Sequence, residues 1–482
     1  MAEYSSEQQY TYENLYDDTT NSIQQETEKD SKKSRIFILV IIATGIALAL
    51  FLIILLFSGI NLQNNNELTE NDNDPIKLTG SILWRGVFID KTIADTLINE
   101  YKKTRPNVTV IYDNVWNNSK NQKDQIIDYQ NELNRILSSN NPLQIPDIFM
   151  IKNTWVGDYE SRIVPHPTET KQSLLSKNYY NFVADDFAQN NVVYGKPLWV
   201  DTFAIVYNKD LLLQNSNVSI VPNNLENFLN FVKNFDTSNS FAFGMGTTFN
   251  VSFAFEFFQI LLMNEGINFE SNEAKLLTNF DYQKFRNAFI FFKSFLPKWS
   301  INQKNDSLAF LEGKLTMIFI PSYRLRNILL FNDIRNLNLN IEISEVPYVN
   351  KKYNVADYWG LVVSRTSTNS KIAWDFIDWL SENSNLELLH NLVKEKAGYF
   401  GTITPKKNIN EKIKQNDKFL NIYINELDHV KTWYQIKGTQ IQIEFEKILR
   451  QQSITREEIL TLNNEIRRLQ QQKGIFSQIN IE

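Results

Sequence analysis

Apolar and polar residues alternate along most of this chain in short blocks that predict β-strands followed by α-helices. The predicted strands are residues 78–84 (LTGSILW), 107–112 (NVTVIY), 147–151 (DIFMI), 203–207 (FAIVY), 315–320 (LTMIFI) and 361–364 (LVVS). Continuous apolar runs such as 203–207 are typical of strands buried on both faces. Strands that alternate with helices indicate an α/β fold with largely parallel sheets.

Helical spacing follows several of these strands. Apolar residues recur every three or four positions in three sets: Ile93, Leu97 and Tyr101; Leu225, Phe228, Leu229 and Val232; and Ala373, Phe376, Ile377 and Leu380. This period places each set on one face of an amphipathic helix. Near the C-terminus, Thr455 and Glu458 form a capping-box pattern, which predicts a helix that begins there and extends through Leu469.

One apolar run is much longer than any strand. Residues 36–57 (IFILVIIATGIALALFLIILLF) are 22 uncharged residues, enough to cross a hydrocarbon core of about 30 Å as a helix. Basic residues precede the run at 29–35 and acidic residues follow it at 67–74, so the positive-inside rule predicts a cytoplasmic N-terminus. A cleaved signal peptide is the alternative, but no small-residue cleavage motif follows the run.

The flanking composition completes the predicted organisation. Residues 1–34 are rich in Glu, Gln, Tyr, Ser and Thr without an apolar period, which indicates a disordered cytoplasmic tail. We expect a transmembrane helix over residues 35–58, a polar linker over residues 59–76, and a folded extracytoplasmic part over residues 77–482. The protein would then be a single-pass protein of the cell membrane.

Composition supports a folded part and argues against several kinds of chemistry. The chain is 43% hydrophobic and 13% aromatic, which favours folded domains, and its net charge of -6 gives no electrostatic reason to bind nucleic acid. His166, His390 and His429 fit no metal-ligand spacing, and the chain contains no cysteine and no GxSxG or Walker motif. We therefore expect no metal, no cofactor and no catalytic residue, although two carboxylates brought together from distant positions would suffice for a glycosidase.

Three segments in order carry a more specific signal. They are residues 193–211 (VYGKPLWVDTFAIVYNKDL), 310–325 (FLEGKLTMIFIPSYRL) and 358–380 (YWGLVVSRTSTNSKIAWDFIDWL). In order and spacing they resemble the extracellular solute-binding proteins of bacterial ABC importers, in particular the sugar-binding branch that includes maltose-binding proteins.

The resemblance implies a two-lobed α/β fold of the periplasmic-binding-protein type (type II), preceded here by the single transmembrane helix. One lobe would contain residues 77–200 and 300–346, and the other residues 203–299 and 358–482. The chain would cross between the lobes near residues 199–202 and again near residues 345–348. The resemblance does not decide whether the chain crosses between the lobes a third time.

The resemblance also implies a function without chemistry. The protein would bind a mono- or oligosaccharide outside the cell and pass it to the permease subunits of an ABC transporter. It departs from the family at Ile60, which stands where a lipobox would end in a lipidated cysteine, so the transmembrane helix would be the tether. Two alternatives are a tethered receptor that signals or scavenges without transport, and a cell-surface glycan-active enzyme.

Tryptophans lie at positions that suit sugar binding, because an aromatic plane matches the apolar face of a sugar and short polar side chains match its hydroxyls. The expected ligand-binding residues are Trp84, Trp155, Trp199, Asp201, Trp359 and Trp433, the last in a KTWY segment that resembles a late family motif. Asp201 corresponds to a family acid that either accepts a hydrogen bond from the sugar or caps the hinge. Trp374 and Trp379 lie on a predicted helix and are expected to pack in the core.

Overall fold

The computed structural model describes residues 78–115, 122–139, 145–238, 240–245, 253–267, 281–295, 305–431 and 437–471. All of them belong to one of the two units into which the chain divides, which comprises Pro75–Trp116 and Gln122–Glu482. The expected tail, transmembrane helix and linker lie outside the described residues, as does Trp433. Within the described ranges, no helix has both the length and the apolar character that crossing a membrane requires.

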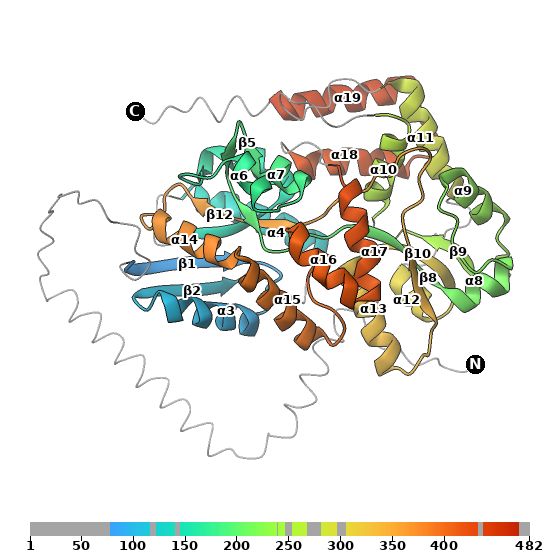
Figure 1. Cartoon of the computed structure of the whole chain (residues 1–482). Coiled ribbons are helices and arrows are strands. Elements are labelled where there is room, and N and C mark those ends of the chain that lie inside the picture. Colours follow the sequence, from blue (N-terminus) through green and yellow to red (C-terminus); the bar gives the residue numbers. More distant parts are fainter. Residues whose placement is uncertain are drawn as a thin grey trace, which may run out of the picture. The chain divides into compact units, whose positions relative to one another are not determined.

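The first sheet has six strands, in the order β2-β1-β3-β12-β4 with β7 also paired to β12. Its strands are β1 (Gly80–Gly86), β2 (Val108–Asn114), β3 (Ile148–Lys152), β4 (Ile163–Val164), β7 (Lys196–Pro197) and β12 (Trp359–Ser364). β1 runs parallel to β2 and β3, whereas β12 is antiparallel to β3, β4 and β7. In Figure 1, helix α3 (Lys91–Thr104) lies along β1 and β2.

The second sheet has four strands in the order β11-β8-β10-β9. They are β8 (Phe203–Asn208), β9 (Phe241–Gly244), β10 (Leu315–Pro321) and β11 (Ile341–Ser344), and a separate pair consists of β5 (Ala188–Gln189) and β6 (Val192–Val193). β8 and β10 are buried at every position and run antiparallel to each other. Figure 1 shows α8 (Lys209–Ser216) and α12 (Asp306–Leu311) beside these strands.

Strand pairing corrects two expectations. The predicted lobe division placed residues 300–346 with the first sheet and residues 358–482 with the second, but β10 pairs with β8 and β9 and β12 pairs with β3. The sheets are also mixed rather than largely parallel. In the first sheet, β12 enters after the chain has visited the second sheet, so β12 lacks the local helical crossover that joins parallel neighbours. In the second sheet, β8 pairs antiparallel with both β10 and β11.

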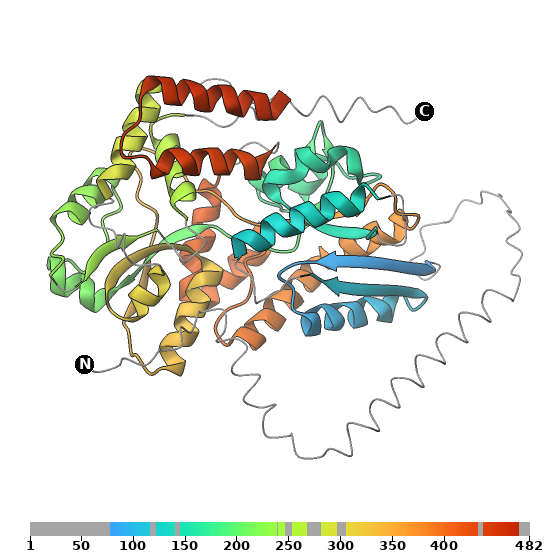
Figure 2. The same ribbon diagram turned by 180° about the vertical axis from the view of Figure 1, so that it is seen from behind.

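Helices surround both sheets. Besides those named above, they are α4 (Gln122–Leu137), α5 (Val156–Tyr159), α6 (Lys171–Ser176), α7 (Asn181–Phe187), α9 (Leu225–Asn234), α10 (Ala254–Asn264), α11 (Tyr282–Phe295), α13 (Ser322–Ile334), α14 (Ser370–Leu380), α15 (Asn383–Ala397), α16 (Lys407–Asn416), α17 (Lys418–Glu426), α18 (Gly438–Arg450) and α19 (Arg456–Gln471). Three short 3₁₀ turns are η4 (Asn153–Trp155), η5 (Glu160–Arg162) and η7 (Leu427–His429). Figure 2 shows α18 and α19 side by side.

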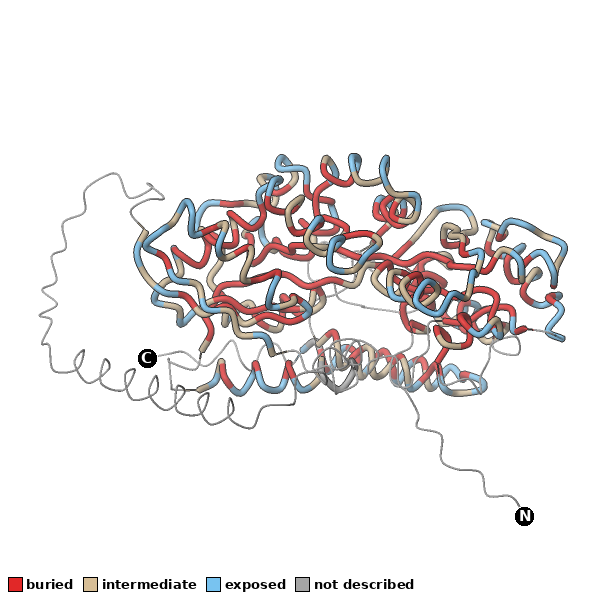
Figure 3. Tube along the Cα trace, turned by 90° about the horizontal axis from the view of Figure 1, so that it is seen from below, coloured by how far each residue is buried: buried red, intermediate tan, exposed pale blue. Residues whose placement is uncertain are grey.

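The predicted helix faces are confirmed. All members of the three apolar sets expected on one side of a helix are among the buried residues of α3, α9 and α14. The capping box is present as well, because the N–H of Thr455 donates to Glu458 Oε2 at 2.7 Å and the N–H of Glu458 donates to Thr455 Oγ1 at 3.2 Å. Figure 3 shows buried positions along the strands and exposed positions on the outer turns of the helices.

Candidate functional site

The chain passes between the two sheets through connecting segments that pair with each other. One segment lies between β7 and β8, and the other between β11 and β12. Thr202 in the first forms a bridge with Ala356 in the second, and Thr202 Oγ1 donates to the carbonyl of Val355 at 2.8 Å. The N–H of Asp357 donates to the carbonyl of Asp201 at 3.2 Å. The two connections therefore form a short antiparallel pair.

The second crossing lies later in the chain than expected. Residues 345–348 stay with the second sheet, because the N–H of Leu225 on α9 donates to the carbonyl of Tyr348 at 2.8 Å. A third connection is present too, since α15 contacts α3 while α17 contacts β8 and β11. Within it, the carbonyl of Ile403 accepts from the N–H of Val200 at 2.9 Å. Three connecting segments thus meet at one place.

Asp201 connects the crossing segments to helix α13, which packs against the second sheet. Its Oδ1 accepts from the N–H groups of Thr202 at 2.8 Å and Ser322 at 3.0 Å, and its Oδ2 accepts from Ser322 Oγ at 2.9 Å and the Tyr323 N–H at 3.2 Å. Ser322 and Tyr323 open α13, so Asp201 caps that helix from another part of the chain. Burial raises the pKa of Asp201 to about 6, and the hydrogen bonds act against that rise. All four hydrogen bonds are internal, as the capping interpretation requires.

The return connection brings a charged pair to the end of the first sheet. Lys152, the last residue of β3, lies with its Nζ 3.1 Å from Asp357 Oδ1, and both side chains are largely buried. Burial alone would lower the pKa of Lys152, but the negative charge of the neighbouring Asp357 carboxylate raises it. Trp359 is the direct cross-strand partner of Lys152, and directly opposed residues share one face of a sheet.

Trp359 and Trp155 belong to an aromatic cluster at this end of the sheet. Trp359 is 5% exposed, and its ring centroid lies 5.1 Å from that of Trp155, 5.4 Å from that of Phe88 and 5.9 Å from that of Tyr129. Trp155 is fully buried and its Nε1 donates to Thr439 Oγ1 on α18 at 2.9 Å. Both rings are packed among other side chains.

The remaining expected residues lie in different surroundings. Trp84 is fully buried, with its ring centroid 4.6 Å from that of Tyr112 and 5.5 Å from that of Phe376, so the structure does not bring it to the crossings. Trp199 immediately precedes the paired connections and is only half-buried. Among the described residues, the Trp199 ring has neither a ring contact nor a hydrogen bond. Of the four expected tryptophans that the structure describes, Trp199 is therefore the one with free aromatic surface.

Glu256 is a residue of this region that sequence reasoning missed. It lies in the first turn of α10 and is 9% exposed, and its Oε2 is buried without a hydrogen-bond partner. Burial raises the pKa of Glu256 to about 8, with Lys152 lowering it and Asp357 raising it. The sequence contains a pattern that could have identified Glu256, because it is the single charged residue in the α10 sequence AFEFFQILLMN. Lys152 could have been identified in the same way, because it is the charged residue that ends the otherwise apolar strand β3.

A second charged group has a structural explanation. His166, Glu169 and Asp378 lie close enough together to hold a metal ion. However, Lys196 Nζ lies 2.6 Å from both Glu169 Oε2 and Asp378 Oδ1 and is itself buried. His166 Nδ1 accepts two backbone N–H groups, so its Nε2 donates to Asp378 Oδ2 at 3.0 Å. The lysine ammonium takes the place that a cation would take.

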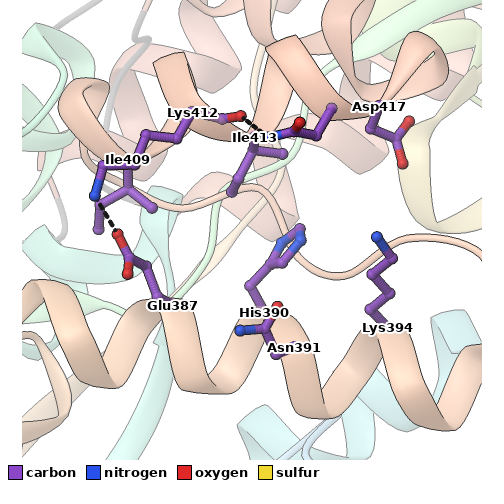
Figure 4. A pocket seen from close by; sticks show the side chains of 9 residues that line it. Glu387, His390, Asn391, Lys394, Ile409, Lys412, Ile413 and Asp417 are labelled. Carbon is purple, nitrogen blue, oxygen red and sulfur yellow. Dashed lines mark hydrogen bonds and ion pairs between the residues drawn. The ribbon is translucent and has the colours of Figure 1, made fainter.

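A polar hollow of about 390 Å³ lies between α15 and α16 (Figure 4). Glu387, His390 and Lys394 line it from α15, and Lys412 Nζ donates across it to Glu387 Oε1 at 2.9 Å. His390 Nδ1 lies 2.7 Å from the carbonyl of Thr402. No tryptophan and no residue of the two paired connections lines this hollow, so the paired connections are the better candidate site.

The chain matches a model of a known protein family. The family model described as bacterial extracellular solute-binding protein matches residues 97–420, which is more than half of the chain. No curated protein matches the chain significantly by sequence.

Solved structures match over nearly their whole length. The sugar-binding protein MalE from Xanthomonas citri superposes with a TM-score of 0.66 at 16% identity, covering 83% of this chain and 100% of that one. The GacH receptor of Streptomyces glaucescens, solved unliganded and with acarbose, gives 0.63 at 17% identity, covering 82% and 99%. The maltotriose-binding protein of Thermus thermophilus gives 0.56 at 16% identity, covering 80% and 99%. At this identity the matches show a shared fold.

The cap formed by Asp201 gives a first prediction. Asp201→Ala removes the acceptor for four donors, so we expect the free energy of unfolding to fall by at least about 2 kcal/mol, because losing an N-cap costs about 1 kcal/mol and each orphaned buried donor adds about 1–3 kcal/mol. Asp201→Asn keeps one oxygen and should lose less. Urea unfolding followed by circular dichroism measures both; an Asp201→Ala midpoint equal to that of the wild type would contradict the capping role.

The aromatic cluster gives a second prediction. Trp359→Ala should lower the free energy of unfolding by about 3–5 kcal/mol, as for other buried tryptophans. Trp199→Ala, on a half-buried ring without ring contacts, is the matched control and should change it by less than about 1 kcal/mol. Differential scanning calorimetry of the two variants separates these cases. Equal thermal midpoints for the two variants would mean that Trp359 is not a packing residue.

Proposed function

The chain belongs to the bacterial extracellular solute-binding proteins, and from this premise we propose that it captures a carbohydrate outside the cell and delivers it to the permease of an ABC transporter. Its two-lobed α/β fold is that of sugar-binding proteins of such importers. The family and these structural neighbours are binding proteins, so the chain is a receptor rather than an enzyme.

Trp199 carries the proposal for the ligand. Its half-buried ring stands at the first crossing, next to the paired connections and the polar residues on them. A sugar needs an aromatic plane for its apolar face and polar groups for its hydroxyls, and this region supplies both. Solved neighbours bound to acarbose, tagatose and maltotriose support a sugar as the ligand.

The other residues predicted to bind the ligand have different roles in this proposal: packing, positioning or ligand contact. Trp155 and Trp359 pack behind the site and hold the end of the first sheet in place, so their effect on binding is through the surface they support. Asp201 positions the crossing through its four internal hydrogen bonds. Trp433 stays a predicted ligand contact, and Trp84 is proposed as a core residue.

The paired connections suit a hinge. A ligand that contacts groups from both sheets binds the closed arrangement better and shifts the population toward it. A permease that recognises the closed arrangement would then distinguish the loaded receptor from the empty one.

Membrane anchoring is the remaining part of the proposal. The uncharged run at residues 36–57 and the opposite charges on its two sides support a single helix with a cytoplasmic N-terminus. The site region would then be held outside the cell near the transporter.

A binding experiment tests the proposal. Titration calorimetry of the purified protein with maltose, maltotriose, acarbose and tagatose should show saturable binding of at least one sugar. Trp199→Ala should weaken that binding roughly thirtyfold or more, since truncating a central aromatic anchor commonly costs about 2 kcal/mol, and should leave the thermal midpoint of the ligand-free protein nearly unchanged. Tyr282→Ala, another partly buried aromatic, is the control. Binding that survives Trp199→Ala would remove Trp199 from the site.

A further inference from the structure

Glu256, on helix α10, lies near a charged residue of the segments that connect the two sheets. It stands on α10, which contacts α11 and α18, and α18 also contacts η4 next to Lys152. The charged groups that act on its carboxyl are Lys152 at the end of β3, Asp357 in the return connection, and Glu446 on α18. Glu256 therefore lies on a helix that packs against the second sheet, while two of the charged groups that act on it come from the first sheet and the return connection.

The carboxyl group of Glu256 lacks a hydrogen bond at one oxygen. Its Oε2 is buried and has no partner, and a buried polar atom without a hydrogen bond is costly. The nearby cation, Lys152, is already paired with Asp357 at 3.1 Å. The first turn of a helix favours an ionised carboxylate, but here that effect opposes burial next to a second carboxylate. A neutral carboxyl group that meets a polar atom of a ligand would remove the cost.

We propose that Glu256 is a ligand-contacting residue whose neutral carboxyl group donates a hydrogen bond from Oε2 to an oxygen of an uncharged sugar, beside the Lys152–Asp357 ion pair. This inference rests on the proposed carbohydrate function and deepens it. It assigns to the second sheet a polar contact that complements Trp199, and it selects neutral sugars over amino sugars, whose ammonium group would require an ionised Glu256.

The pH dependence of binding follows from the groups around the site. Glu256 donates only while it is protonated, so affinity should fall as the pH rises through about 8. Lys152 has its pKa raised and keeps its charge over this range. In the ligand-free protein, the raised pKa of Glu256 means that the folded state holds a proton that the unfolded state releases above about 4.5. Wild-type stability should therefore fall relative to Glu256→Gln as the pH rises from 4.5 to 8.

The experiment compares variants of the full chain by titration calorimetry with maltotriose and tagatose as probes and glucosamine as the charged comparison. At pH 7, Glu256→Gln should bind within about threefold of the wild type, because its amide also donates, whereas Glu256→Met should bind at least about tenfold more weakly. Raising the pH to 9.5 should weaken binding to the wild type and leave Glu256→Gln unchanged. Glu265→Gln, at the far end of the same helix, is the matched control. Thermal unfolding of the ligand-free variants from pH 5 to 9 follows the proton independently of the sugar.

Each result decides a different point. A wild type that binds a neutral probe while Glu256→Met binds it equally well would overturn this inference alone. Affinity that increases with pH, or preferential binding of glucosamine that Glu256→Gln abolishes, would show an ionised carboxylate and overturn it as well. A wild type that binds none of the neutral probes would contradict the proposed carbohydrate function and the ligand contact together. Parallel stability profiles for wild type and Glu256→Gln would contradict the neutral carboxyl group.

Discussion

The buried carboxylate of Asp201 is the interaction on which the connection between the two sheets depends. Its two oxygens accept four hydrogen bonds, and three of them come from the first residues of α13. Its main-chain carbonyl accepts from Asp357 in the return connection. Asp201 therefore fixes the start of α13, which packs against the second sheet, and aligns the two connecting segments with each other. A buried charge is tolerated here because each oxygen is fully hydrogen-bonded.

The alignment set by Asp201 extends to the end of the first sheet. Asp357 is held by its backbone, so its side chain meets Lys152 at the end of β3, and the register of β12 then places Trp359 opposite Lys152. A buried ion pair contributes little stability by itself because its desolvation offsets its attraction. Its effect is positional: it fixes polar groups at the point where the sheets are joined. In the proposed site, the ring of Trp199 and the Oε2 atom of Glu256, which lack partners, are the groups that a ligand would contact.

Much of this arrangement could be read from the sequence, and the rest could not for definite reasons. The apolar runs at residues 203–207 and 315–320 predicted β8 and β10, because a strand buried on both faces needs such a run. They could not predict which sheet β10 joins, since that depends on how often the chain has crossed. The sequence predicted both Trp199 and Trp359 as ligand-binding residues, but burial differs between them because it depends on Phe88, Tyr129 and Trp155 from distant segments. Glu256 stood out only as one charge in an apolar helix, and its neighbours become visible only in the folded chain.

We propose that a sugar bound at the crossings brings the two sheets closer together. Small-angle X-ray scattering of the purified protein, with and without a saturating sugar, tests this most directly. We expect a smaller radius of gyration in the presence of the sugar and no change with a sugar that calorimetry shows does not bind. Tight binding accompanied by an unchanged scattering curve would contradict it.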